Sequence, residues 1–535
     1  MDHPQEINLL TLNCWGLYLL SAQRRPRLSH IGQVIASSSP QPDIVSLQEC
    51  WTREDYLSIR SSTRHILPHG KFYHSGVFGA GLAILSRWPI EESSMIRYPL
   101  NGRPTAFFRG DWFVGKGVAT ARIRFGEGRA RRDGIIEVFN THTHAPYEKE
   151  PHDSYICHRT AQAWEVSKLV RGARERGHLV VAMGDFNMVP GSSAHEIVTV
   201  AGGMTDVWQA VHPDSALGPV EDPAEKKSGR PVPTAEENVR VNGVTSNSVY
   251  NTWRWGKGER KKLGPGREWP VIEPDTEDPR GQRLDYIFAS DGTGREEGVW
   301  TVEDVRVGML ERHPVLGCSL SDHFSVEATL AFRSREKDLD LGNVVETKKG
   351  TATVSTVSND HYRRDVPWKE RRHDLTIRDE SDDQALQNGV YLRSPTGSEY
   401  HVANSASNGP ERALSGDADD VPGRLPVSTY DDILAMLHKY VMREKTQRRW
   451  RGLHFFVWVA VLIACLVGVW FVPHNYVAFI LMLVSSLGLV AGTVDGLIAL
   501  LFVNTELRAL KEFEWEILNA KAAAGGGPMP DDPTW

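Results

Sequence analysis

The chain lacks a patterned set of cysteines. Only five occur among 535 residues, and neither their odd number nor their spacing fits a disulfide framework or a zinc site. We therefore expect reduced thiols in a protein exposed to cytosol. The cysteines are Cys14, Cys50, Cys157, Cys318 and Cys465.

The sequence also lacks an excess of basic residues. Its net charge is −7 and its pI is near 6.3, so it has no global positive field for nonspecific binding to nucleic acid. We predict no nucleic-acid partner. The first ten residues, "MDHPQEINLL", contain no basic stretch followed by an apolar one, so we expect no cleaved signal peptide.

Composition divides the chain into five parts. In residues 1–332, short β-rich apolar runs alternate with Gly/Pro loops and a few helical patterns, which predicts an α+β domain. Residues 333–426 are polar and read as a flexible, disordered linker that lets the first domain rotate over a membrane. A basic helix is expected at 427–452, two apolar runs fill 453–503, and 504–535 form a cytosolic helix and tail.

The two apolar runs, 453–472 and 477–503, predict a transmembrane hairpin. Each has about 20 residues or more, enough at ~1.5 Å per residue to cross a ~30 Å hydrocarbon core. Basic residues crowd the outer end of the first run, and the short connecting loop has none, so the large domain is expected in the cytosol. The same cluster should attract anionic phospholipids, which we expect to act as activators. It comprises Arg443, Lys445, Arg448, Arg449 and Arg451.

Small residues recur every four positions on both predicted spans. This spacing allows close helix contact and favours packing within the hairpin, with homodimerisation as the alternative. They are Ala460, Ala464 and Gly468 on the first span and Gly488, Gly492 and Gly496 on the second. Asp495 is an acid inside the second span, where it predicts either an interhelical hydrogen bond or a contact with lipid.

Polar side chains stand at the ends of several strand-like runs. One example is "VVAMGDFN", in which Asp185 and Asn187 follow a buried strand. Such ends predict a common rim, where carboxylate and amide oxygens suit Mg²⁺ and imidazoles suit proton transfer. Metal-assisted hydrolysis of a phosphodiester is the resulting hypothesis. The other candidates are Asn13, Glu49, His142, Asp285, Asp322 and His323.

In this order, these motifs resemble the endonuclease/exonuclease/phosphatase superfamily. That resemblance implies a DNase I-like four-layer α/β/β/α sandwich followed by the hairpin. The segments "NGRPTAFFRGDWFVGKG", "CHRTAQAWE", "NTWR", "RGLHFF" and "GTVDG" are similar to the membrane-bound neutral sphingomyelinase family. The similarity covers residues 7–332 and 430–520.

The resemblance implies roles for the rim residues. Asn13, Glu49 and Asp322 are expected to hold Mg²⁺. Asn187 is expected to bind the phosphoryl group, and His142, preferred over His144, to stabilise charge in the transition state. Asp185 is one candidate base for the attacking water. His323, oriented by Asp285, is the other, and the sequence leaves the choice open.

The segment "GDWFVGKG" at 110–117 matches G-x-x-x-x-G-K, but Gly117 stands where a phosphate-binding loop requires Ser or Thr. We therefore predict no nucleotide binding. The resemblance implies instead that Asp111 and Lys116 form an activation switch. A surface ion pair is the alternative.

Together these features predict an integral membrane, Mg²⁺-dependent phospholipase C of sphingolipid catabolism. It would hydrolyse inositol phosphosphingolipids or sphingomyelin to ceramide and a phosphorylated headgroup. A phosphoinositide phosphatase or nuclease on the same fold, and an inactive membrane adaptor, are the alternatives. The endoplasmic reticulum is the expected membrane, with the mitochondrial outer membrane as the alternative. The sequence does not decide the headgroup.

Overall fold

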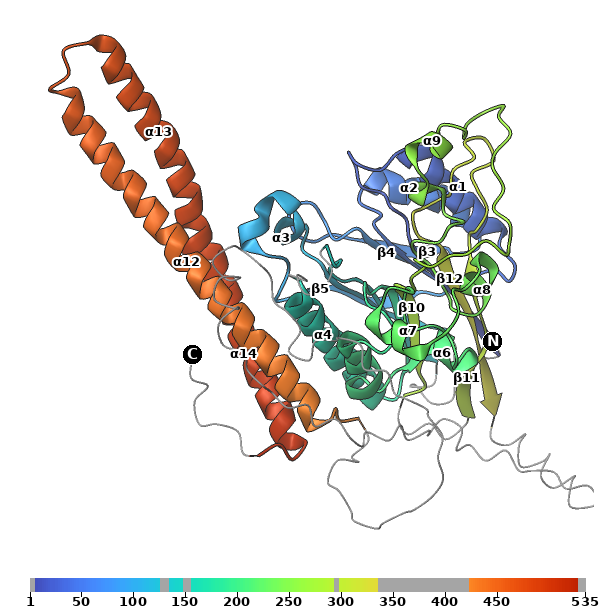
Figure 1. Cartoon of the computed structure of the whole chain (residues 1–535). Helices are drawn as coiled ribbons and strands as arrows, with labels where there is room; N and C mark the ends of the chain where they lie inside the picture. The colour runs from blue at the N-terminus through green and yellow to red at the C-terminus, as the bar shows by residue number, and fades with distance from the viewer. Residues whose placement is uncertain (1–4, 126–133, 148–154, 293–297, 335–422, 528–535) are drawn as a thin grey trace, which may run out of the picture.

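The computed structural model describes residues 5–125, 134–147, 155–292, 298–334 and 423–527 (Figure 1). Apart from its first and last few residues, the predicted linker at 333–426 lies outside these ranges. Its predicted flexibility therefore stays a prediction.

Two six-stranded mixed sheets form the centre of the N-terminal domain. The first has the order β11-β12-β1-β2-β4-β3, and the second has the order β5-β6-β7-β8-β10-β9. The strands of the first sheet are β1 (Glu6–Asn13), β2 (Ile44–Gln48), β3 (His69–Tyr73), β4 (Leu82–Ser86), β11 (Gly298–Gly308) and β12 (Ser325–Ser334). Those of the second are β5 (Ile90–Arg97), β6 (Gly117–Arg124), β7 (Ile135–His142), β8 (Leu179–Asp185), β9 (Thr205–Asp206) and β10 (Asp285–Ser290). Among the described strands, only the pairs β1–β2 and β7–β8 are parallel.

The two sheets pack face to face because alternate strand residues are apolar. Ile7 and Leu9 of β1 share one buried cluster with Val138 of β7 and Val181 of β8. Helices α1 (Arg24–Ser37) and α2 (Arg53–Thr63) cover the outer face of the first sheet. Helix α4 (Ile156–Glu175), α5 (Ser193–Glu196) and the turn η2 (Ile197–Ala201) cover the second. The predicted α/β/β/α sandwich is confirmed.

Short helices occupy the connections between strands. They are η1 (Pro104–Arg109), α3 (Asp111–Val114), α6 (Val207–Val211), α7 (Pro223–Ser228), α8 (Ala235–Arg240), η3 (Thr252–Arg254) and α9 (Lys257–Arg260).

Two long apolar helices form a hairpin at the C-terminal end (Figure 1). Helix α12 (Val427–Val469) is followed by α13 (Asn475–Leu497), the π-turn η5 (Ile498–Phe502) and α14 (Val503–Ala523). Both helical stretches are long and apolar enough to cross a membrane. The predicted basic helix and first span are one continuous helix, because a single glycine, Gly452, does not interrupt it.

The lower part of the hairpin packs on α4 of the N-terminal domain. Leu437 of α12 and Leu510 of α14 join the buried cluster that contains Val166 of α4. Trp164 Nε1 donates to Glu516 Oε2 over 2.6 Å, so polar contacts accompany the apolar ones. In this structure the domain is docked on the helices, which differs from the expectation that the linker lets the domain rotate over a membrane.

Inside the hairpin, the glycines of α13 accommodate aromatic side chains of α12. A Cβ atom at Gly488 would lie 1.9 Å from the Trp458 ring, and one at Gly496 would lie 3.0 Å from Phe455. The stripe on α13 therefore packs within the hairpin. Ala460 and Ala464 of α12 are exposed instead.

Asp495 makes interhelical contacts. It forms an ion pair with Arg451 of α12, and His454 Nδ1 lies 2.8 Å from its Oδ2. Of the two roles that the sequence suggested for Asp495, the structure has the interhelical one.

Candidate active site

The strand topology gathers the polar strand ends at one edge of the sandwich. Because β1 runs parallel to β2 and β7 runs parallel to β8, their carboxyl ends meet at the same edge. Asn13 ends β1, His142 ends β7 and Asp185 ends β8. Asp285 opens β10, opposite Asp185 in the antiparallel register. The predicted rim thus exists.

Asp185 lies at the centre of this group. Its Oδ2 accepts a hydrogen bond of 3.0 Å from Asn13 Nδ2, and its Oδ1 accepts one of 3.0 Å from the Asn187 backbone N–H. His142 Nε2 is 3.6 Å from the same Oδ2. Burial raises the pKa of Asp185 to about 6, and the neighbouring Asp285 adds to this rise. The carboxyl group is therefore poised to exchange a proton near neutral pH.

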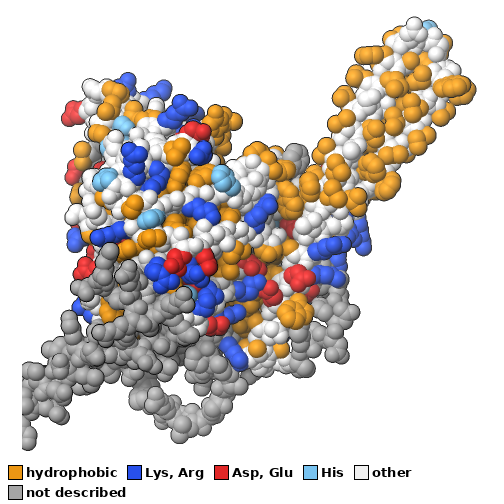
Figure 2. All heavy atoms as spheres, turned by 180° about the vertical axis from the view of Figure 1, so that it is seen from behind, with side chains coloured by type: hydrophobic (Ala, Val, Ile, Leu, Met, Phe, Trp, Pro, Cys, Tyr) orange, Lys and Arg blue, Asp and Glu red, His pale blue; other side chains and the backbone are white. Residues whose placement is uncertain are grey.

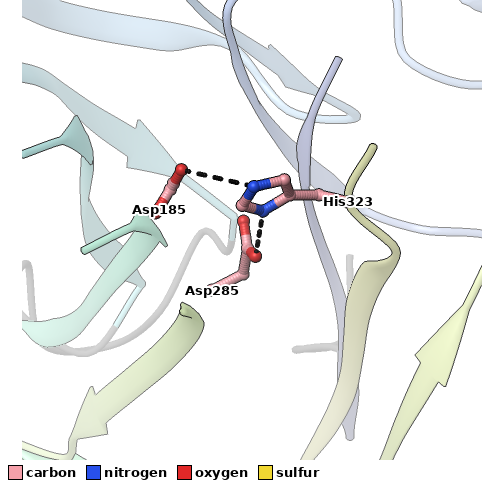
Figure 3. A group of neighbouring side chains, drawn as sticks. All are labelled: Asp185, Asp285 and His323. Carbon is pink, nitrogen blue, oxygen red and sulfur yellow. Dashed lines mark hydrogen bonds and ion pairs between the residues drawn. The ribbon is translucent and has the colours of Figure 1, made fainter. Parts of the chain in front are cut away.

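Asp285 and His323 form a dyad beside Asp185 (Figure 3). His323 Nδ1 lies 2.7 Å from Asp285 Oδ2, and its Nε2 lies 4.0 Å from Asp185 Oδ2. Burial by itself would lower the pKa of His323. The carboxylates of Asp285 and Asp185 outweigh it and hold that pKa well above its usual value. One donor atom from each of the three residues lies within 4.8 Å of the other two, as in a metal site.

Glu49 lies on the other side of Asn13. Asn13 Nδ2 is 3.4 Å from Glu49 Oε1. Burial, and secondly the charge of Asp322, raise the pKa of Glu49 to about 7. Burial also raises the pKa of Asp322. Two neighbouring acids with raised pKa values repel each other when both are charged. A cation bound beside them would reduce this repulsion.

The backbone at two of these residues adopts the left-handed conformation. Glu49 has a φ of 51° and Asn187 a φ of 46°. Glutamate rarely occupies this region, so its conformation is held by the surrounding structure at a cost in free energy. Such strain concentrates at functional sites, which agrees with a role for Glu49.

The structure separates the two candidate histidines, His142 and His144. His142 faces Asp185, and burial together with Lys116 lowers its pKa, which keeps the ring neutral. His144 is fully buried and stacks on Tyr155 with ring centroids 4.5 Å apart. The side chain that meets the rim is therefore His142, the histidine that the resemblance favoured, and its role in the reaction stays a prediction.

Asp111 and Lys116 are buried close to the rim. Lys116 Nζ donates to the Thr143 carbonyl over 2.9 Å, and Asp111 Oδ1 accepts from the Tyr147 hydroxyl over 3.0 Å. Burial lowers the pKa of Lys116 and raises that of Asp111. In the described part of the chain no ion pair joins the two, and neither lies on the surface.

The five predicted lipid-binding basic residues differ in their surroundings. Arg443 is buried and pairs with Glu444, and Arg451 pairs with Asp495. Arg448 donates to Asn504 Oδ1 over 2.7 Å, Lys445 is half-buried and Arg449 is exposed. Figure 2 shows basic side chains gathered at the base of the apolar hairpin.

The sequence reasoning missed two residues that shape the site. The Thr143 carbonyl accepts from both Lys116 Nζ and Asn187 Nδ2 and so links them. Arg27 is fully buried and donates to the carbonyls of Trp15 and Leu320. It lies on the buried face of α1 with Leu28, Ile31 and Ile35, and a charged residue on that apolar stripe is the signal that could have found it.

The family model "Endonuclease/Exonuclease/phosphatase family" matches residues 10–323, which include every rim residue. The chain belongs to this family. The inositol phosphosphingolipids phospholipase C of Schizosaccharomyces pombe is 43% identical over 62% of this chain and 70% of its own length. The enzyme of that name from Saccharomyces cerevisiae is 30% identical over 96% of this chain and 90% of its own length.

The sphingomyelin phosphodiesterase 2 of Homo sapiens is 32% identical over 34% of this chain and 41% of its own length. These likenesses confirm the resemblance to the neutral sphingomyelinase family that the sequence motifs indicated. The match to the Saccharomyces cerevisiae protein extends over almost the whole chain.

Proposed function

We propose that this protein is a membrane-attached phospholipase C that hydrolyses sphingolipids to ceramide and a phosphorylated headgroup. It is a phosphoric diester hydrolase, as its family and its named relatives establish. The observation that carries the proposal is the 43% identity to an inositol phosphosphingolipids phospholipase C, across a domain whose polar strand ends converge. Inositol phosphosphingolipids are therefore the first substrates to test, and sphingomyelin is the second.

The rim fits a hard divalent cation. Glu49 Oε2 and Asp285 Oδ1 are buried and have no hydrogen-bond partner in the described part of the chain. Oxygen donors of this kind suit Mg²⁺. We assign the cation to Asn13, Glu49 and Asp322, because Glu49 and Asp322 are neighbouring buried acids with raised pKa values, whereas Asp285 Oδ2 is engaged with His323 over 2.7 Å. When bound, the ion would supply Lewis-acid stabilisation of a phosphoryl oxygen.

The residues around that site suggest a division of labour. Asp185 Oδ2 and His323 Nε2 face each other over 4.0 Å, so a water molecule near both could give its proton to the Asp185 carboxylate, or to His323 when that ring is neutral. Asp285 would hold His323 in the required orientation. The neutral ring of His142 and the side-chain amide of Asn187 would donate hydrogen bonds to the phosphoryl oxygens as negative charge develops.

We propose two further features on the same basis. Asp111 and Lys116 act as an activation switch, since Lys116 shares the Thr143 carbonyl with Asn187. Anionic phospholipids activate the enzyme through Lys445, Arg448 and Arg449 at the base of the hairpin. Arg443 and Arg451 would serve the packing of the hairpin, because each pairs with an acid.

For the location, we propose that α12 and α13 span the membrane and that the catalytic domain faces the cytosol. Basic residues at 443–451 precede the first span, and the loop at 473–476 that joins the two spans has no Lys or Arg. Both features support this orientation. The endoplasmic reticulum is the membrane to examine first, followed by the mitochondrial outer membrane. A role in sphingolipid catabolism would follow from the reaction.

The test is turnover by the purified full-length protein in mixed micelles. Inositol phosphoceramide, sphingomyelin, a phosphoinositide and DNA are offered separately with Mg²⁺, and then after chelation. We expect ceramide from one or both sphingolipids, loss of turnover with the chelator and recovery with Mg²⁺. Turnover of only the phosphoinositide or DNA would contradict the proposal. Binding of sphingolipid without turnover would favour an inactive adaptor.

A further inference from the structure

Two loops beside the active site carry exposed apolar side chains at their tips. Leu19 and Leu20 follow β1 and are 87% and 77% exposed. Val77 and Phe78 lie between β3 and β4 and are 76% and 60% exposed. Single exposed apolar residues are ordinary, but adjacent pairs on loop tips mark an interaction surface. We call these four residues the apolar rim.

The topology places both loops at the catalytic edge of the sandwich. The Leu19–Leu20 loop leaves β1 after Asn13. The Val77–Phe78 loop enters β4, which runs antiparallel to β2 and so begins at the end of β2 that precedes Glu49. A Cβ atom at Gly81, in the same loop, would lie 3.3 Å from the Cα atom of Glu49. The apolar rim therefore borders the opening of the site.

A chain of contacts joins one of these loops to the base of the hairpin. The Val77 backbone N–H donates to the Phe113 carbonyl over 2.7 Å, and the rings of Phe78 and Phe113 pack edge to face. The preceding residue of α3, Trp112, contacts Phe502 of η5 with ring centroids 5.5 Å apart. Figure 1 shows α3 beside the hairpin, which runs on beyond it. Apolar contacts thus connect the hairpin through α3 to the loop that carries Val77 and Phe78.

From this continuity we infer that the apolar rim inserts into the lipid bilayer that the hairpin crosses. Leu19, Leu20, Val77 and Phe78 enter the interfacial region and hold the catalytic edge at headgroup depth. The ester between ceramide and phosphate lies at that depth, so a docked edge meets its substrate without extracting it. Exposed Arg25, close after the first loop, faces the headgroups. The inference rests on the proposed function for its membrane and its substrate.

Direct insertion is tested by environment-sensitive labels on the full-length protein in vesicles. The described cysteines are buried except Cys465, which is partly buried. In a Cys465→Ala background, Leu19→Cys and Phe78→Cys each receive an NBD label. Leu57→Cys is the matched control, because Leu57 is an exposed leucine on the outer side of α2. We expect blue-shifted emission and quenching by lipid-borne nitroxide at Leu19 and Phe78, and neither at Leu57. If the labels at Leu19→Cys and Phe78→Cys stay in water, as the label at Leu57→Cys should, the inference is overturned.

A second measurement separates insertion from catalysis. The double variant Leu19→Ser with Leu20→Ser should lose at least about tenfold of its turnover on sphingolipid in vesicles, since two leucines no longer partition into lipid. Turnover of a monomeric short-chain substrate should stay within about twofold, and Leu57→Ser should change neither. Equal losses on both substrates would show damage to the site and count against the inference. If the wild type hydrolyses no sphingolipid in either form, the proposed function fails, and the labels alone decide insertion.

Discussion

At the scale of single residues, the site depends on acids that are buried beside one another. Glu49, Asp322 and Asp185 all have raised pKa values, with burial as the largest cause. A cation bound by these carboxylates would lower those pKa values again. The repulsion among these buried acids and the proposed affinity for a divalent ion would therefore have the same origin.

Glu49→Gln keeps the size of the side chain and removes its charge. We expect turnover to fall by at least about a thousandfold at saturating lipid, because a ligand of the cation loses its charge. Calorimetric titration should show weaker Mg²⁺ binding, while the melting temperature should not fall. Near-normal turnover would remove Glu49 from the site. The exposed Glu54→Gln serves as the control.

Asp285→Asn tests the dyad through its pH profile. The carboxylate of Asp285 helps to raise the pKa of His323, so its removal should shift the ionisation of the imidazole to lower pH. We expect turnover to fall by about a hundredfold or more. In the profile of turnover against pH, the midpoint of the ionisation assigned to His323 should move to lower pH. An unchanged midpoint would show that the profile reports another group, such as Asp185.

Lys116→Met tests the proposed switch. Loss of the hydrogen bond from Lys116 to the Thr143 carbonyl should disturb Asn187, which donates to the same oxygen. Turnover should fall by about 10- to 100-fold, while binding to vesicles stays unchanged. Lys71→Met, on β3, is the control. Full activity in Lys116→Met would reduce Lys116 to a structural lysine.

At the scale of elements, the strand-end pattern predicted the convergence of the site correctly. A polar residue that ends a buried strand must lie at an edge of the sheet. The pattern of apolar residues and the direction of the strands were therefore enough to predict that these residues converge. The distances were beyond the sequence, since they depend on how the two sheets pack. The separation of His142 from His144 likewise depends on the stacking of Tyr155, which comes from the segment that opens α4.

The C-terminal helices show where sequence reasoning fell short. The spacing of Tyr430, Ile433, Leu437 and Tyr440 marks a buried face of α12. The sequence analysis predicts only a basic helix here. Composition reports local preference, whereas the docking onto α4 is a long-range contact.

Asp206 holds α6 and the end of β9 in place. It caps α6 and contacts Arg283 and His195 at 2.7 and 3.0 Å. Burial is the largest single effect and would raise the pKa of Asp206, but Arg283 and His195 together outweigh it and lower that pKa to about 2. Because this pKa is below its value in the unfolded chain, the stabilisation of about 2 kcal/mol is present above pH 4 and is lost toward pH 2.

Asp206→Asn should therefore destabilise the protein by roughly 3–5 kcal/mol at pH 7, since Arg283 is left buried and unpaired. The difference in the free energy of unfolding between Asp206→Asn and the wild type should stay constant down to about pH 5 and become smaller below about pH 4. Thermal unfolding across that range provides the measurement. Glu303→Gln removes an exposed ion pair with Arg333 and should have little effect. If the difference in unfolding free energy did not depend on pH, the lowered pKa of Asp206 would be contradicted.

At the scale of the whole molecule, α12 and α14 complete the core of the catalytic domain. A chain that ends at residue 334 would expose the apolar face of α4, and we expect it to bind a hydrophobic dye and melt at a lower temperature. In the full-length protein, Leu510→Asp should reproduce both effects, because Leu510 is fully buried in this interface. The exposed Asn519→Asp should not. An equally stable truncated domain would show that the docking adds nothing to the fold.

The central claim is that water attacks phosphorus and releases ceramide. Hydrolysis of inositol phosphoceramide by the full-length enzyme in H₂¹⁸O tests it directly, with mass spectrometry of both products. We predict that the phosphorylated headgroup carries the ¹⁸O and that ceramide carries none, with no turnover in the Glu49→Gln variant. Formation of ceramide phosphate, or ¹⁸O in the ceramide hydroxyl, would contradict a phospholipase C.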